Sequence, residues 1–151
     1  MPKPPLNIPK ESLVDIETHI SATIANGGHI RGLLAGFSDK PPWSEEWEVK
    51  AAVEALHVFG SRWTTEILAA LYITGGKRFN RLKNLLTGIS SRTLSDKLRF
   101  LVDEGLVVRD VYDGPPIMVE YNLTSHRKIC GKLLSPLVAH LKIKNGSISP
   151  I

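Results

Sequence analysis

The chain has 151 residues, 42% of them hydrophobic and 23% charged, a composition typical of a globular protein with one sizeable core. No apolar run approaches the roughly 18 residues of a membrane helix, the first residues lack the apolar segment of a signal peptide, and one cysteine excludes an internal disulfide, so the sequence predicts a cytoplasmic protein without a membrane span. That cysteine and five scattered histidines share no ligand spacing, and we expect no metal and no other cofactor.

Charge is distributed unevenly along the chain, whose net charge is +4. Segment 1–59 has five Lys and Arg against eight Asp and Glu, segment 60–112 has nine against five, and segment 113–151 has five against two. The basic C-terminal two-thirds favours a negatively charged partner. The alternative is that these charges are only solvated and that their uneven distribution arose by chance. We would favour that alternative if the basic residues did not coincide with a DNA-binding motif.

The N-terminal residues predict a helical extension. Met1–Ile8 is rich in proline and is expected to be loose. Ser12 with Asp15 resembles a capping box at the start of a helix, which Asn26-Gly27-Gly28 is expected to end. The predicted helix has an apolar stripe formed by Leu13, Ile16, Ile20 and Ile24.

A second short helix is predicted over 29–37, and Pro41-Pro42 predicts a hinge before the next domain. An amphipathic extension cannot bury its apolar stripe alone. We therefore expect residues 1–43 to complete a dimer core. The alternative is a ligand pocket with aromatic walls at Phe37, Trp43 and Trp47, which leaves a small-molecule effector open.

Two further helices are predicted before the basic region. Ser44 is a suitable N-cap for a helix that runs to about Phe59, because acidic residues follow it in the first turn. The next helix is predicted over 61–73 and closed by Gly75-Gly76. Its buried stripe is expected to consist of Trp63, Ile67, Leu68 and Leu71.

The segment from Gly75 to Gly105 predicts two short helices joined by a turn. The first apolar stripe is Phe79, Leu82, Leu85 and Leu86, and the second is Ile89, Leu94, Leu98 and Leu101. Thr87-Gly88 is expected to end the first helix, and Ser90 is expected to cap the second. This arrangement is a helix-turn-helix, whose second helix, about Ser90–Gly105, can enter a DNA major groove.

The same segment is strongly basic, with seven Lys and Arg between Lys77 and Arg99 against one acid, Asp96. This excess is typical of a surface that lies on phosphates. Arg92 has the chemistry to pair with guanine, whereas Asp96 more often orients a neighbouring arginine. The candidate DNA-binding residues are Arg78, Arg81, Lys83, Ser90, Ser91, Arg92, Ser95, Asp96, Arg99 and Arg109.

Two strand-like runs follow this segment, Leu106–Tyr112 and Ile117–Leu123, separated by the turn residues Asp113-Gly114-Pro115-Pro116. A hairpin directly after a recognition helix is a wing. Over about Val53–Lys128 the chain resembles the HxlR-type winged helix-turn-helix transcriptional regulators of the MarR-like superfamily. The resemblance rests on Gly60-Ser61-Arg62-Trp63-Thr64, Ile67-Leu68, Arg78-Phe79-Asn80-Arg81-Leu82, Ile89-Ser90, Leu94-Ser95, Leu98, Leu101, Glu104-Gly105-Leu106-Val107, Arg109, Pro115-Pro116 and Val119-Glu120-Tyr121-Asn122-Leu123-Thr124.

Two positions depart from the family pattern. In the family, the two prolines of the wing are usually followed by one basic residue and then Val-Glu-Tyr, whereas here Ile117-Met118 intervene. The wing is thus longer by one residue and lacks that cation, so its contact with the minor groove stays open. After the wing, Arg127 stands where the family has glycine.

The last helix is expected to be capped by Thr124 and to have an apolar stripe at Ile129, Leu133, Leu137 and Leu141, which suits a dimer interface. Pro136 predicts a kink or a break, and the tail after Lys144 is expected to be loose. The predicted domains are 1–43, a helical extension for dimerisation; 44–124, the winged helix-turn-helix domain; and 125–151, a dimerisation helix with a tail.

The sequence thus predicts a mainly α fold with a small β-hairpin. The resemblance implies a homodimeric, sequence-specific regulator of transcription that binds double-stranded DNA and is not an enzyme. Two alternatives remain: a winged-helix module for protein–protein interaction within a larger assembly, and a DNA-coating chromatin protein without sequence preference.

Overall fold

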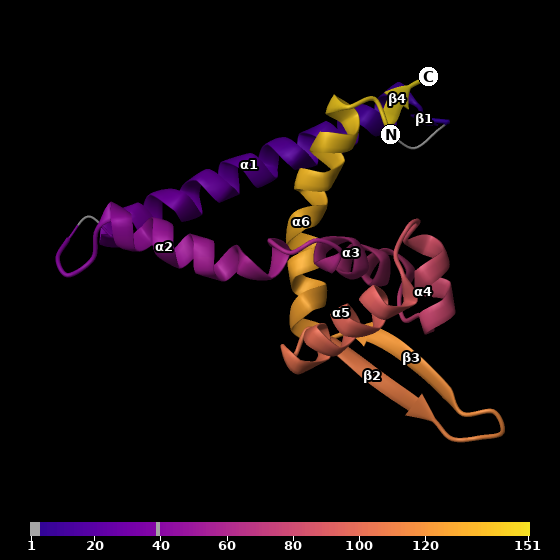
Figure 1. Cartoon of the computed structure of the whole chain (residues 1–151). Coiled ribbons are helices and arrows are strands. Elements are labelled where there is room, and N and C mark those ends of the chain that lie inside the picture. The colour runs from indigo at the N-terminus through magenta and orange to yellow at the C-terminus, as the bar shows by residue number, and fades with distance from the viewer. Residues whose placement is uncertain (1–3, 39) are drawn as a thin grey trace. The chain divides into compact units, whose positions relative to one another are not determined.

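The computed structural model describes residues 4–38 and 40–151, with the side chain of Val58 left out. Met1–Lys3, which belong to the segment expected to be loose, lie outside the described residues, as does Asp39. The chain groups into two compact units, Ala52–Gly131 and Met1–Ala51 with Lys132–Ile151. Along the chain the elements are β1 (Leu6–Ile8), α1 (Lys10–Ser38), α2 (Glu45–Leu56), the 3-10 turn η1 (His57–Phe59), α3 (Thr64–Thr74), α4 (Phe79–Leu85), α5 (Ser91–Asp103), β2 (Val107–Tyr112), β3 (Met118–Leu123), α6 (Ser125–Lys144) and β4 (Ile148–Pro150) (Figure 1).

The unit Ala52–Gly131 has one hydrophobic core, built by α3, α4, α5 and the base of the β2–β3 hairpin. Most of the apolar positions predicted for α3, α4 and α5 are buried in it, which confirms the mainly helical fold with a small hairpin. Leu85 is an exception, since it is exposed, while Trp63 and Phe79 are only partly buried. The buried side chains are Ile67, Leu68, Leu71, Leu82, Leu86, Ile89, Leu94, Leu98, Leu101, Leu106, Val107 and Leu123.

The turn between α4 and α5 has the predicted chemistry. Gly88 adopts a positive φ of 91°, which glycine tolerates without steric cost. Ser90 is the N-cap of α5, because the Thr93 amide donates to Ser90 Oγ at 3.0 Å. The helix-turn-helix predicted from the sequence is therefore present.

The wing is an antiparallel pair of β2 and β3, in register from Val107 opposite Leu123 to Tyr112 opposite Met118. Figure 1 shows the hairpin extending away from the helices of this unit. Lys77 forms an isolated antiparallel β-bridge with Tyr121 of β3. The two residues exchange backbone hydrogen bonds, with N···O distances of 3.0 and 2.8 Å. The segment before α4 is thereby fixed to the wing.

Helix α3 starts later than the sequence predicted, at Thr64 rather than residue 61. Trp63 precedes it with a left-handed backbone, φ 72°, which no propensity argument anticipates for an aromatic residue. The segment before the helix is held locally, since Ser61 Oγ lies 2.8 Å from Thr64 Oγ1.

In the second unit, α1 is one helix where the sequence predicted two, so the expected stop at Asn26-Gly27-Gly28 is wrong. A glycine ends a helix by adopting a left-handed conformation, and neither glycine here does so. In a helix interior each costs only about 1 kcal/mol relative to alanine. The helix also begins at Lys10, with the Leu13 amide donating to the Pro9 carbonyl at 3.1 Å, so Ser12 is not its cap.

Polar contacts join the end of α1 to the start of α2. Glu48 accepts from Ser38 Oγ at 2.7 Å and pairs with Arg31, whose Nη1 lies 2.6 Å from Oε1. The predicted cap of α2 is present, because the Trp47 amide donates to Ser44 Oγ at 3.2 Å. The connection between these two helices contains Pro41-Pro42, where the sequence predicted a hinge.

Both ends of the described chain contain a strand, which corrects two predictions: a loose tail after Lys144 and a loose N-terminal segment, at Leu6–Ile8. β1 and β4 form a parallel pair, with Leu6 opposite Ile148 and Ile8 opposite Pro150. Such pairing joins segments far apart in sequence and cannot be read from local composition. Pro136 was predicted to kink or break the last helix, and the break does not occur, because α6 runs through it from Ser125 to Lys144.

Candidate nucleic-acid interface

Helix α5 divides into a buried side and an exposed side. Leu94, Leu98 and Leu101 are buried in the core at 0, 1 and 0% exposure. The predicted contact residues on this helix, namely Ser91, Arg92, Ser95, Asp96 and Arg99, are all exposed. The leucines therefore fix the helix in the unit, while its polar side chains are free to meet a partner.

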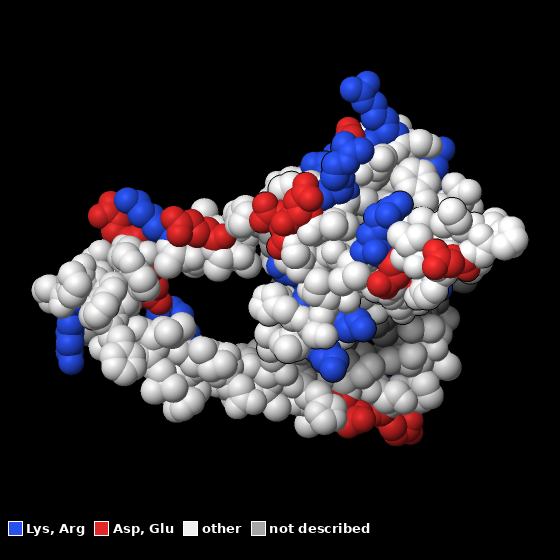
Figure 2. Space-filling view, turned by 90° about the horizontal axis from the view of Figure 1, so that it is seen from below, with Lys and Arg blue, Asp and Glu red and all other residues white. Residues whose placement is uncertain are grey.

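The start of α4 brings further basic residues into the same unit. Arg78 is the N-cap residue of this helix, with an extended backbone, and it is exposed together with Arg81 and Lys83. Arg109 is exposed on β2, opposite Tyr121 of β3. Seen from the side of the wing, Lys and Arg side chains stand out from the surface, with acidic side chains between some of them (Figure 2).

The basic residues between Lys77 and Arg99 keep their charge unpaired. Across the described residues, salt bridges join only His19 to Asp15 and Arg31 to Glu48, and both lie outside this segment. Asp96, which could have oriented a neighbouring arginine, pairs with none of them. A surface of exposed cations without internal carboxylate partners is available to bind phosphates.

Lys97 is the basic residue of α5 that the structure binds internally. Its Nζ donates to Ser61 Oγ at 2.9 Å, and the side chain is half-buried. Ser61 in turn contacts Thr64 at the start of α3. Lys97 thus connects α5 to the segment that precedes α3. The sequence pattern alone gave no role for this residue.

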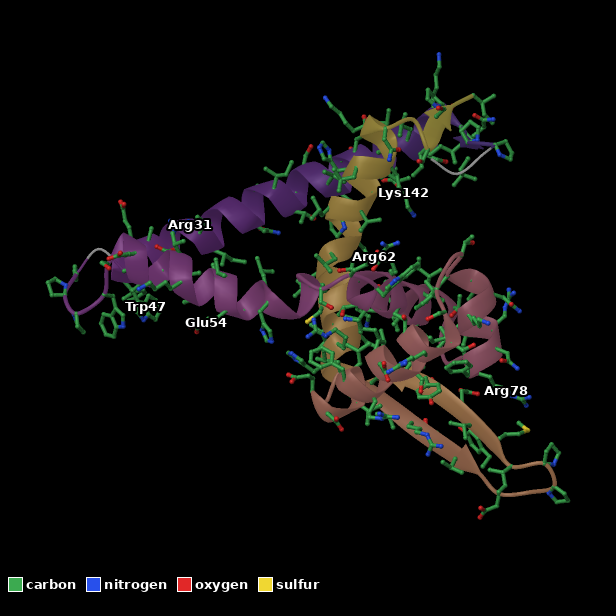
Figure 3. The ribbon with its side chains drawn as sticks, in the orientation of Figure 1. Arg31, Trp47, Glu54, Arg62, Arg78 and Lys142 are labelled. Atoms are coloured by element: carbon green, nitrogen blue, oxygen red, sulfur yellow. The ribbon has the colours of Figure 1, made fainter. Side chains whose placement is uncertain are left out.

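Arg78 contacts the wing. Its Nη2 donates to Met118 Sδ at 2.9 Å, across 40 positions of sequence. Figure 3 shows Arg78 at the start of α4, near the hairpin. No sequence signal predicted this contact, because it depends on the strand position of Lys77 beside Tyr121.

The wing has two chemically different regions. In the middle of the hairpin, Asp110 and Glu120 face each other across the strands, and the Asn122 side-chain amide donates to both, at 3.0 and 3.2 Å. Toward its tip, Val111, Tyr112 and Ile117 are exposed. This tip lacks the cation usual in the resembled family, as the sequence indicated.

The proposed aromatic walls of a ligand pocket are exposed. Phe37, Trp43 and Trp47 have exposed fractions of 73, 48 and 51%, and the two tryptophan rings meet edge to face at 6.4 Å. In the described part of the chain, no group of three or more His, Cys, Asp or Glu could hold a metal ion. Among the same residues, no helix is long and apolar enough to cross a membrane.

A helix-turn-helix with an exposed polar second helix, followed by a two-stranded wing, defines the class of winged helix-turn-helix proteins. The model of the HxlR-like helix-turn-helix family matches residues 58–146, more than half of the chain. The protein therefore belongs to the HxlR-like family and is a regulator of transcription with a helix-turn-helix DNA-binding domain. The family consists of regulators rather than enzymes.

Individual relatives agree with this assignment. The chain is 35% identical over 99 residues to the HTH-type transcriptional regulator YdeP of Bacillus subtilis, covering 66% of this chain and 73% of YdeP. It is similar in structure to a protein described as a transcriptional regulator of the MarR family from Enterococcus faecalis, at 28% identity and a TM-score of 0.56, covering 72% and 94% of the two chains. The structure of the HTH-type regulator YtcD, also from B. subtilis, matches at 35% identity and a TM-score of 0.51, covering 62% of this chain and 91% of YtcD.

Proposed function

We propose that the protein binds double-stranded DNA as a homodimer and inserts α5 into the major groove. The observation that carries this proposal is the exposed side of α5, which presents polar and cationic groups that no carboxylate of the described chain neutralises. A helix of this kind can donate to and accept from base edges while its buried leucines hold it in place.

The candidate residues divide by chemistry. Ser90 is the N-cap of α5, and Ser91, Arg92 and Ser95 lie in its first turns. A recognition helix enters a groove most deeply there, so we assign base contacts to these four residues. Arg78, Arg81, Lys83, Arg99 and Arg109 are assigned to phosphates, which fix position without reading sequence. Asp96 is assigned to accept from a cytosine amino group, because it orients no arginine within the described chain.

The dimer is proposed from the apolar side of α6. Ile129, Leu133 and Leu137 are more than half exposed in the single chain, at 55, 72 and 53%. Exposed leucines in one row on a helix are typical of a surface that a partner covers. Two copies joined by a two-fold axis would place two recognition helices on successive turns of DNA.

The salt dependence of binding tests the proposal. If a dimer neutralises about six to eight phosphates, the logarithm of the association constant should fall with the logarithm of the salt concentration with a slope of roughly −5 to −7. A flat response would contradict DNA binding and favour the protein-interaction module. The exposed apolar wing tip is a surface that such a module could use. Equal affinity for all duplexes would instead favour the DNA-coating protein.

A further inference from the structure

The contact between Arg78 and Met118 is set by the backbone as well as by the side chains. Lys77 is paired with Tyr121 through two backbone hydrogen bonds, so the next residue, Arg78, continues alongside β3 toward its start. Met118 is the first residue of β3 and is half-buried. The sulfur therefore lies where the exposed arginine at the start of α4 can reach it, at 2.9 Å.

A carboxylate on the same face of β3 is directed elsewhere. Residues 118, 120 and 122 share one face of the strand, because side chains alternate. Glu120 accepts from the Asn122 amide at 3.2 Å and makes no ion pair with Arg78 within the described chain. Arg78 thus contacts the uncharged sulfur of Met118, although the carboxylate of Glu120 lies two residues away on the same face of β3.

The chemistry of the thioether matters here. Sulfur in methionine is a weak acceptor without charge, so it can orient a guanidinium without neutralising it. A carboxylate in its place would hold the arginine more tightly and remove its attraction for phosphate. Met118 also directly precedes Val119-Glu120-Tyr121, the place at which the resembled family pattern has its basic wing residue.

We propose that Met118 is a positioning residue, whose sulfur holds the Arg78 guanidinium beside the first residue of β3, at the end of the strands next to the wing tip, as a phosphate-binding cation shared by α4 and the wing. Arg78 thereby supplies from the start of α4 the positive charge that the wing tip lacks. The proposal rests on the DNA-binding function proposed above. It concerns a phosphate contact, which any duplex offers, and not the recognition of one sequence.

The test is a double-mutant cycle on a mixed-sequence double-stranded DNA, with affinity measured over a series of salt concentrations. Arg78→Ala should weaken binding and make the salt slope shallower by about 2 per dimer, one phosphate for each subunit. Met118→Leu keeps the volume but removes the acceptor, and should weaken binding roughly 2- to 10-fold for each subunit of the dimer, the range expected for one hydrogen bond. In the Arg78→Ala background, Met118→Leu should have no further effect.

Two variants act as controls. Met118→Gln restores an acceptor on a side chain of similar length and should retain the wild-type affinity. Ile117→Ala removes the neighbouring exposed side chain and should leave affinity unchanged in both backgrounds. Thermal unfolding of Met118→Leu should match that of the wild type.

Several outcomes would overturn the positioning role. An unchanged affinity for Met118→Leu, or the same loss with and without Arg78, would show that the sulfur does not act through the arginine. A loss in Met118→Gln equal to that in Met118→Leu would show that the acceptor is irrelevant. If the wild type itself lacks salt-dependent binding to DNA, the proposed function fails first, and the positioning role fails with it.

Discussion

The side-chain amide of Asn122 lies 3.0 Å from a carboxylate oxygen of Asp110 on the neighbouring strand. The same amide reaches Glu120, which stands directly opposite Asp110 in the hairpin. Like charges directly opposite each other destabilise an antiparallel pair. One amide therefore holds two carboxylates in the middle of the wing, where the sequence pattern alone would suggest repulsion.

Replacing Asn122 with alanine should lower the stability of the wing. The two carboxylates would lose their common donor, and because both are only half-buried, water can replace part of the loss. We expect a cost of about 1 kcal/mol, visible as a fall of roughly 2–4 °C in the midpoint of thermal unfolding. Asn84→Ala, at an exposed position of α4, is the control and should not lower the midpoint, because alanine favours the helix.

Gly76 should tolerate no side chain without disturbing this arrangement. A Cβ at this position would overlap Asn122 Oδ1 and Glu120 Oε1, so Gly76→Ala must displace the amide from its carboxylates. Gly76→Ala should therefore lower stability, and the double variant with Asn122→Ala should lose less than the sum of the two single losses. Full additivity would show that the two substitutions act independently.

Gly28 provides the opposite case. A Cβ there meets open space in the middle of α1, and the backbone is helical. Gly28→Ala should therefore stabilise this helix by up to about 1 kcal/mol. Circular dichroism and thermal unfolding would measure the change, and a loss of stability would show that a partner approaches α1 closely at this glycine.

Arg92 and Lys83 should differ in kind when DNA binding is measured. Arg92→Ala should cost about 1–3 kcal/mol on the preferred duplex and relax the preference at one base pair, because arginine can pair bidentately with guanine. Lys83→Ala should weaken binding to matched and scrambled duplexes alike. The preferred duplex is obtained by selection from random DNA, and equal losses on both duplexes for Arg92→Ala would show that it reads no base.

The winged unit was predictable because its signals are local. The spacing of Leu94, Leu98 and Leu101, the cap at Ser90 and the turn residues of the hairpin each act within a few residues. The sequence therefore predicted the core leucines, the helix-turn-helix and the wing. The exposed polar residues of α5 were predictable for the same reason, because the side of a helix opposite its buried stripe faces solvent.

What the sequence could not predict depends on distant partners. The strand pair of β1 with β4 and the contact of Arg78 with Met118 join residues that are far apart in the chain. The continuity of α1 was missed for a different reason: glycine ends a helix only when its backbone turns left-handed, and Gly27-Gly28 stays helical. The left-handed Trp63 likewise has no signature in local propensity.

The proposed dimer predicts that charge on the apolar side of α6 separates the subunits. Leu133 and Leu137 lie one turn apart and are exposed in the single chain, whereas the stripe of α1 is half-buried at Leu13, Ile16 and Ile20. Aspartate at both leucines should therefore yield monomers, because two charges would have to be buried without partners. Lys142→Ala, on the opposite side of α6, changes net charge in the same direction as each Leu→Asp and should leave the dimer intact.

Sedimentation at micromolar concentration decides between these states, and DNA affinity should fall together with dimerisation. A two-fold dimer sets its recognition helices about 34 Å apart, so the preferred site should be an inverted repeat with half-site centres roughly 10 base pairs, or a multiple, apart. Monomers made by the double aspartate variant should bind a single half-site weakly and lose sensitivity to this spacing. A wild type that sediments as a folded monomer would contradict the dimer, and the exposed leucines of α6 would then need another partner.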